Sequence, residues 1–217
     1  MPGARKGERS RETRARIVVA GSTLFCDHGY LDTTMAAIAA GAGVAVQTLY
    51  LTFGSKVAIL EAAHDRAVVG DDEQVPVLQR DWVVEAQAEP NGSEALKLIL
   101  SNARRINQRV APIYRAIQAA AADPDVADLL NRIRDQRLLT MQALAGDLAT
   151  KAGFDASHTV DEVADVLYAV ASMELLDLLV VQRQWSVDAL DEWAYDIAAE
   201  RLFSTHRGSS AAVMLDR

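Results

Sequence analysis

The sequence predicts an all-α protein, and three observations lead to that prediction. Apolar residues recur at steps of three and four along the 217 residues, which is the spacing of one face of a helix. No segment alternates apolar and polar residues with a period of two, so no strand is expected. Glycine, proline and hydroxyl residues stand where the periodic stretches begin and end, as helix caps and breakers do.

Two helices are expected near the start of the chain. The hydroxyl of Ser10 can cap the first helix, and Gly29 can end it in the left-handed conformation. The second helix is short. It begins at Met35, where the hydroxyl of Thr34 can accept a hydrogen bond from an unpaired amide of the first turn, and Gly43 breaks it.

A third short helix is expected over about residues 45–52, and a fourth after Gly54 and Ser55. A helix-turn-helix needs a small residue where its helices touch, a sharply turning residue four positions later and an apolar anchor six beyond that. Ala39, Gly43 and Leu49 meet these demands. The residues expected on the outward side of the third helix are Ala45, Val46, Gln47, Thr48, Tyr50 and Thr52.

Five more helices are predicted beyond residue 70. They run over about residues 76–82, 93–123, 124–153, 159–184 and 186–203. Pro112 should kink or divide the second of these, because an interior proline removes a backbone hydrogen bond. Thr159 and Glu162 have the spacing of a capping box at the start of the fourth. Residues 207–217 are expected to form a flexible tail.

The formal net charge of −8 is unevenly distributed along the chain. Residues 1–56 contain seven lysines and arginines against four acidic residues, so they carry +3 and the remaining residues carry −11. A positive end attracts a phosphate backbone, and an acidic remainder keeps the rest of the molecule off DNA. A basic tail that is merely solvated would explain the same split.

The segment AGVAVQTLYLTFGSK resembles the recognition region of the TetR family of bacterial repressors, together with the threonine pair at residues 33 and 34 and the helix ending FCDHGY. The match covers roughly residues 10–60, and beyond it only the length and the helix pattern are compatible. The resemblance implies an N-terminal arm and helix-turn-helix DNA-binding domain over residues 1–56. It also implies a helical ligand-binding and dimerisation domain over residues 57–206. The expected function is a transcriptional regulator, a repressor that a small-molecule effector releases from its operator.

The resemblance also assigns roles to residues. It implies phosphate contacts from Thr34, Tyr50, Thr52 and Lys56, which would set affinity and register. Gln47 is the best candidate for pairing with adenine, with Val46 or Ala45 available to touch a thymine methyl group. Each residue also has a simpler explanation: Tyr50 covering the small core, Lys56 solvated or bridging to an acid, and Gln47 as an ordinary surface residue.

Three positions depart from the family pattern. Ala45 stands where serine is frequent and cannot cap the third helix, Thr52 stands where histidine or tyrosine is frequent, and Gly41 replaces a helix former. Ala45 and Gly41 motivate an alternative function, a helical dimeric ligand-binding protein without specific DNA binding. The operator sequence cannot be transferred from the family.

The last two helices are expected to pair with their copies in a homodimer, because a helix-turn-helix dimer binds two half-sites through a two-fold clamp. Packing within one chain is the alternative for these apolar residues: Leu175, Leu176, Leu179, Val180, Leu190, Trp193, Ala194, Ile197 and Leu202. A small-molecule site is expected among the helices from about Trp82 to Tyr168. Its candidate residues are Trp82, Tyr114, Gln118, Met141, Tyr168 and Glu174.

Other classes of protein find little support. The four histidines are scattered, and no motif of a metalloprotease, hydrolase or phosphate-binding loop occurs, so we expect neither catalysis nor a metal or cofactor. No apolar run reaches the length of a membrane span, and no secretory signal follows the basic start, so a cytoplasmic protein is expected. The single cysteine, Cys26, is expected in the core beside Phe25.

Overall fold

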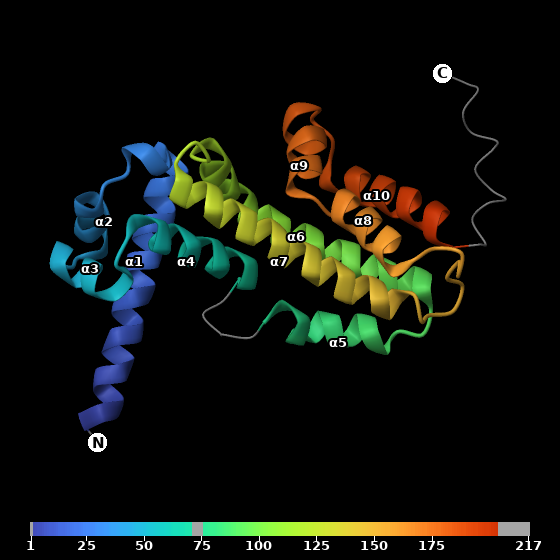
Figure 1. Cartoon of the computed structure of the whole chain (residues 1–217), viewed down its shortest axis with the longest axis horizontal. Coiled ribbons are helices and arrows are strands. Elements are labelled where there is room, and N and C mark those ends of the chain that lie inside the picture. Colours follow the sequence, from blue (N-terminus) through green and yellow to red (C-terminus); the bar gives the residue numbers. More distant parts are fainter. Residues whose placement is uncertain (1, 71–75, 204–217) are drawn as a thin grey trace. The chain divides into compact units, whose positions relative to one another are not determined.

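A computed structural model describes residues 2–70 and 76–203 of the chain (Figure 1). Ten α-helices follow one another along these residues: α1 (Pro2–Asp32), α2 (Met35–Ala42), α3 (Val46–Phe53), α4 (Lys56–Val69), α5 (Asp81–Ala88), α6 (Gly92–Ala119), α7 (Pro124–Leu148), α8 (Val160–Val170), α9 (Met173–Leu176) and α10 (Val187–Leu202). A 3-10 turn η1 (Val77–Gln79) precedes α5, and a π-helical turn η2 (Asp177–Gln182) follows α9. Within the described residues the only β-type pairings are two isolated bridges. The all-α prediction is therefore confirmed.

The described residues divide into two compact units. One contains residues 2–70 and 109–134, and the other contains residues 76–108 and 135–203. α6 and α7 each contribute to both units. α4 packs against α1 within the first unit, together with α2 and α3. Residue 56, where the sequence placed the domain boundary, is the first residue of α4. The tail predicted over residues 207–217 lies outside the described residues.

A close approach of α1 to α4 forms the core of the first unit. A Cβ atom at Gly21 of α1 would lie 2.6 Å from the Cγ2 atom of Ile59 on α4, so only glycine permits this contact without a shift. The fully buried apolar side chains around it come from all four helices: Ile17, Phe25, Ile38, Leu49, Ile59 and Leu60. This shared core holds α2 and α3 against α1 and α4 (Figure 1).

The first helix is longer than predicted. α1 begins at Pro2, and Ser10 is an exposed residue within it instead of its cap. The residues before position 17 are mostly strong helix formers, and Glu12 stands four residues before Arg16, a spacing that stabilises helices. The backbone leaves the helical conformation at Gly29, where φ is 79°, as predicted.

Cys26 is exposed, so its predicted place in the core was wrong. Neighbouring residues of a helix point about 100° apart. Because Phe25 is fully buried, the next residue turns toward the solvent.

The helix predicted over residues 159–184 is interrupted. α8 stops before Ala171, and the hydroxyl of Ser172 starts a new turn by accepting a hydrogen bond from the amide of Leu175. The side-chain amide of Asn107 on α6 donates a hydrogen bond of 2.8 Å to the carbonyl oxygen of Ala171. A helix end in the interior needs such partners for its carbonyl groups. α6, in contrast, continues through its interior proline without being divided.

The predicted capping box is present at the start of α8. The hydroxyl of Thr159 accepts a hydrogen bond from the amide of Glu162, and the Glu162 carboxylate accepts one of 2.8 Å from the amide of Thr159. The backbone amide of Thr159 and then its hydroxyl, which donates a hydrogen bond of 3.2 Å to the same carboxylate, lower the pKa of Glu162.

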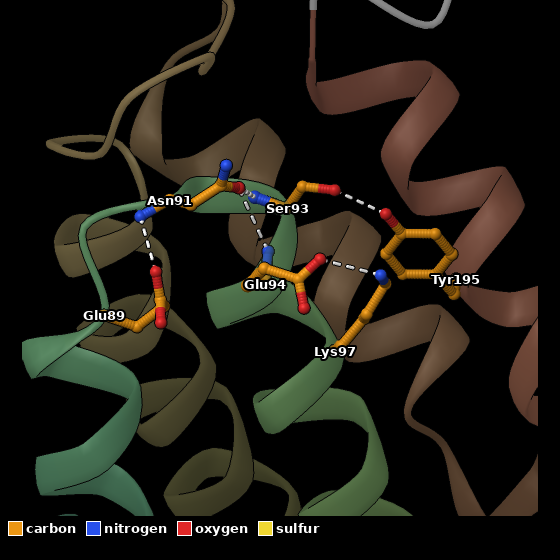
Figure 2. A network of polar contacts seen from close by, with 6 residues as sticks. All are labelled: Glu89, Asn91, Ser93, Glu94, Lys97 and Tyr195. Atoms are coloured by element: carbon orange, nitrogen blue, oxygen red, sulfur yellow. Dashed lines mark hydrogen bonds and ion pairs between the residues drawn. The ribbon is translucent and has the colours of Figure 1, made fainter.

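A polar network joins the start of α6 to α10 in the second unit (Figure 2). The side-chain oxygen of Asn91 accepts hydrogen bonds from the amides of Ser93 and Glu94, at 2.9 and 3.2 Å, and so caps α6. The hydroxyl of Ser93 is hydrogen bonded to that of Tyr195 on α10. The ammonium group of Lys97 pairs with Glu94 at 2.8 Å and lies over the ring of Tyr195.

Within the described residues no single helix is long and apolar enough to cross a membrane.

Candidate nucleic-acid interface

The turn between α2 and α3 depends on one left-handed residue. Gly43 has φ 64°, and its amide donates a hydrogen bond of 3.1 Å to the carbonyl oxygen of Ala40. The amide of Val44 donates one of 3.0 Å to the carbonyl oxygen of Ala39. This pair of bonds is the Schellman arrangement that ends a helix and redirects the chain.

The two helices joined by this turn are bent by 103° relative to each other, within the range of about 90–120° for a helix-turn-helix. Ala39 is buried where the helices meet, and Leu49 is fully buried on the inner side of α3. The structure therefore confirms the spacing argument made for Ala39, Gly43 and Leu49. It follows that the opposite side of α3 faces away from the core.

Four uncharged side chains form the exposed side of α3, called here the α3 outer face: Val46, Gln47, Tyr50 and Leu51. Leu51, which the sequence argument missed, is 82% exposed, and Tyr50 is 53% exposed. The helix period would have placed Leu51 there, because it follows Gln47 by four residues.

The two threonines of α3, Thr48 and Thr52, are half-buried. The hydroxyl of Thr52 donates a hydrogen bond of 2.7 Å to the carbonyl oxygen of Thr48 within the same helix. The phosphates of DNA only accept hydrogen bonds, so a phosphate contact from Thr52 requires its hydroxyl to rotate away from the carbonyl oxygen of Thr48.

The two short helices are capped differently. Thr34 is exposed, and its hydroxyl accepts a hydrogen bond of 3.1 Å from the amide of Ala37, which confirms its predicted capping role for α2. Ala45 is the N-cap residue of α3 and provides no side-chain hydrogen bond, as its side chain dictates.

Lys56 makes contacts that the sequence did not predict. Its ammonium group donates hydrogen bonds to the carbonyl oxygens of Tyr30, at 2.7 Å, and Thr33, at 2.9 Å, and lies 4.1 Å from the centre of the Tyr30 ring. Burial lowers the pKa of Lys56, and the acidic residues Asp123 and Asp32 act in the opposite direction. The first residue of α4 thus ties down the end of α1 and the turn into α2.

Thr33 itself is almost fully buried in this turn. Its hydroxyl shares its one proton between the carbonyl oxygens of Gly29, at 2.7 Å, and Leu24, at 3.2 Å. These two contacts close the end of α1, so the position of α2 is fixed from both sides of the turn.

Residues 17–63 match the sequence model described as bacterial regulatory proteins, tetR family. This N-terminal segment is therefore a DNA-binding segment of the tetR type. The matched segment contains all of α2, α3 and the turn between them, together with about the second half of α1 and the first half of α4. No curated protein sequence matches the chain.

Solved structures of regulators share the fold over most of their length. A transcriptional regulator from Saccharomonospora viridis, in complex with choline, is 21% identical with a TM-score of 0.66 over 88% of this chain and 98% of that one. FadR from Bacillus subtilis, in complex with stearoyl-CoA, is 17% identical with a TM-score of 0.67 over 85% and 96%. NalD, the secondary repressor of the MexAB-OprM multidrug efflux pump in Pseudomonas aeruginosa, is 18% identical with a TM-score of 0.70 over 91% and 98%.

The six candidate effector residues lie in different places. Tyr114 is buried and Gln118 exposed, both on α6 within the first unit. Met141 belongs to the buried core of the second unit, and the half-buried Trp82 and Tyr168 pack against that core.

Tyr168 and the exposed Glu174 are brought together by Arg137 of α7. The Arg137 guanidinium lies 3.7 Å from the centre of the Tyr168 ring and pairs with the Glu174 carboxylate at 3.3 Å. It also donates a hydrogen bond of 3.2 Å to the carbonyl oxygen of Tyr168. The partner that a carboxylate in this apolar run requires is thus a residue of the same chain.

The second unit contains a buried charge that the sequence did not reveal. Arg104 of α6 has a side chain only 3% exposed, and its Nε atom donates a hydrogen bond of 2.9 Å to Asp191 of α10. Its Nη1 atom is buried and has no hydrogen-bond partner among the described residues. The helical pattern offers no signal for such an arginine, because a charged residue is ordinarily expected at the surface.

The residues expected at a dimer interface differ in burial: Leu176 is buried, and Leu175, Leu179 and Val180 are half-buried. Leu190, Ala194 and Leu202 are fully buried in the core of their own chain, which was the alternative explanation for them. Trp193 and Ile197 remain exposed on α10. Leu178 and Val181 of η2 are also exposed, so η2 and α10 both carry exposed apolar residues.

Proposed function

We propose that this chain represses transcription by binding operator DNA through α2 and α3, and that a small-molecule effector releases it. The main support is the 103° bend between α2 and α3, which turns the uncharged α3 outer face away from the core. This bend lies within the segment that matches the tetR family. A second helix presented in this way can enter the major groove of DNA. The alternative of a ligand-binding protein without specific DNA binding leaves that exposed face unexplained.

The DNA contacts that we propose are of two kinds. Thr34, Tyr50, Thr52 and Lys56 contact phosphates and set the register of the protein on the duplex. Lys56 already donates two hydrogen bonds to carbonyl oxygens, so its third N–H group is the one directed at phosphate.

Base contacts come from the first turn of α3. Gln47 pairs with an adenine, and the small side chains of Ala45 and Val46 with Thr48 fit against neighbouring base edges. The exposed positions of Gln47, Val46 and Ala45 support this assignment.

We propose that the protein binds DNA as a homodimer through its last two helical segments. The exposed apolar residues Leu178, Val181, Trp193 and Ile197 support this interface. Two copies are needed because the half-sites of a helix-turn-helix dimer lie about 34–36 Å apart on one face of the duplex. Replacing Ile197 by aspartate places a charge in the proposed interface and is expected to turn the dimer into a monomer in sedimentation experiments. The same replacement at Ile106, which is half-buried on α6, is the comparison and should leave the protein dimeric.

An effector site in the second unit is part of the proposal. The Saccharomonospora viridis regulator was solved with choline and the Bacillus subtilis FadR with stearoyl-CoA, two ligands of very different chemistry. These two complexes support a small-molecule effector for this chain. Trp82, Met141, Tyr168 and Glu174 are the candidate contacts of this site, whereas Tyr114 and Gln118 belong to the first unit and are not part of it.

The decisive experiment is selection from random DNA duplexes with the purified full-length protein. A two-fold symmetric site should be enriched, and binding to it should weaken as salt rises, because phosphate contacts release counterions. The protein with Gly43 replaced by valine is the matched control, since a β-branched residue at φ 64° distorts the turn between α2 and α3. Enrichment of no site by the folded wild-type protein would refute the proposal.

A further inference from the structure

The α3 outer face has an unusual composition for a surface that meets DNA. The helix sequence VQTLYLTF contains no lysine, arginine, aspartate or glutamate. Its exposed members are Val46, Gln47, Tyr50 and Leu51, and Leu51 has the largest exposed fraction among the large hydrophobic residues described. An isolated exposed leucine is ordinary on a protein surface, but this one extends a face already made of a valine and a tyrosine.

The helix period arranges these four residues in two adjacent rows. Val46 and Tyr50 are four residues apart, as are Gln47 and Leu51, so each pair lies one turn apart on the same side of α3. Leu49 is fully buried and fixes the rotation of the helix about its axis. The N-terminal residues of a recognition helix are the ones that contact base edges, and here they begin with Val46 and Gln47.

The chemistry of this face distinguishes between base pairs. Guanine offers two acceptors in the major groove that arginine or lysine reads, and cytosine offers an amino group that aspartate or glutamate reads. The α3 outer face has neither kind of side chain. Arg14 packs at the end of α3, but its guanidinium lies 4.2 Å over the ring of Phe53 and is not part of that face.

Adenine and thymine match what the face does offer. Adenine pairs with a glutamine amide through two hydrogen bonds, and thymine presents a methyl group to apolar side chains. We propose that α3 recognises a half-site of A·T base pairs, in which Leu51 and Val46 pack on thymine methyl groups on either side of the adenine read by Gln47. This inference rests on the proposed function, since it names the class of operator that the same face selects.

The test uses the site enriched by the full-length protein. Each thymine of the half-site is replaced in turn by deoxyuridine, which removes only the methyl group. Loss of one buried methyl is expected to weaken binding about fourfold. In the Leu51→Ala protein one of these sensitive positions should lose its response to deoxyuridine. Leu51 is so exposed that this variant is expected to fold normally.

Leu139→Ala is the matched control, because Leu139 is an exposed leucine on α7, at 60%, outside the α3 outer face. It should leave affinity and the deoxyuridine response unchanged. An enriched two-fold site whose half-sites consist of G·C pairs, or one indifferent to deoxyuridine, would overturn the inference and leave operator binding standing. Failure to enrich any site would overturn both. A change of oligomeric state in Leu51→Ala without a change in DNA affinity would assign the face to a protein contact and also overturn it.

Discussion

The ammonium group of Lys56 lies 2.9 Å from the carbonyl oxygen of Thr33, 23 residues earlier in the chain. This hydrogen bond and its companion to Tyr30 join the first turn of α4 to the turn that starts α2. A lysine assigned from sequence to a phosphate is thus also a structural tie, and the two roles have separate experimental signatures.

Replacing Lys56 by methionine should lower the free energy of unfolding by about 1–3 kcal/mol. The change removes two hydrogen bonds from a charged donor and the contact with the Tyr30 ring. Chemical denaturation measures the effect. Lys97→Met is the control, because Lys97 is half-exposed and its pair with Glu94 stays in contact with solvent. Equal losses in the two variants would contradict a structural role for Lys56.

The same variant tests the phosphate contact through its salt dependence. If the third N–H group of Lys56 binds phosphate, the slope of log affinity against log salt should decrease by about one unit in Lys56→Met. Affinity measured on the selected operator at several salt concentrations gives this slope. A weaker affinity with an unchanged slope would leave Lys56 as a positioning residue only.

Replacing Gln47 by alanine should relax specificity at one base pair of each half-site. Loss of a paired contact with adenine costs about 1–3 kcal/mol of discrimination, which competition between operators differing at that base pair would measure. Gln87→Ala, at an exposed position of α5, serves as the control. If Gln47→Ala weakens binding to the operator and to random DNA equally, the residue does not read a base.

Replacing Gly92 by alanine should destabilise the second unit by about 1–3 kcal/mol. The new Cβ atom would lie 2.5 Å from the ring of Phe203 and 3.1 Å from the carbonyl oxygen of Ala152. Gly146→Ala on α7 is the matched change, because nothing lies within 4 Å of its Cβ position, and it should stabilise the protein by about 0.5–1 kcal/mol. Thermal unfolding of both variants checks the opposite signs, and a shift in the same direction would contradict this packing.

The capping box of α8 should make stability depend on pH. Because the folded state lowers the pKa of Glu162 below its ordinary 4.5, its contribution is present above that value. The contribution should disappear as the pH falls through the lower pKa of the folded state. Denaturation of the wild type and Glu162→Gln at neutral and acidic pH should show a difference that shrinks in acid. Glu85→Gln, at an exposed position of α5, controls for general charge effects, and a difference independent of pH would argue against the assignment.

Much of the DNA-binding segment could be predicted because its determinants are close together in sequence. Ala39, Gly43 and Leu49 lie within eleven residues, and the caps at Thr34 and Thr159 act on amides three residues away. The outward position of Gln47 follows from the helix period alone. The same period places Leu51 one turn beyond Gln47, on the exposed side of α3.

Other features depended on residues that are distant in sequence. The break between α8 and α9 is held by Asn107, which is 64 residues away from the carbonyl group it binds. Arg104 is buried because Asp191, 87 residues later, reaches its guanidinium. Nothing local to either segment indicates these partners.

The sequence by itself thus determined the helical class, most helix ends, the helix-turn-helix and the outward direction of Gln47. These follow from the helix period and from hydrogen bonds that span a few residues. Only the tertiary structure decided the partners of Lys56 and Arg104, the exposure of Cys26 and the interruption after α8. A polar group removed from water must find a partner, and which distant residue provides it depends on how the helices pack.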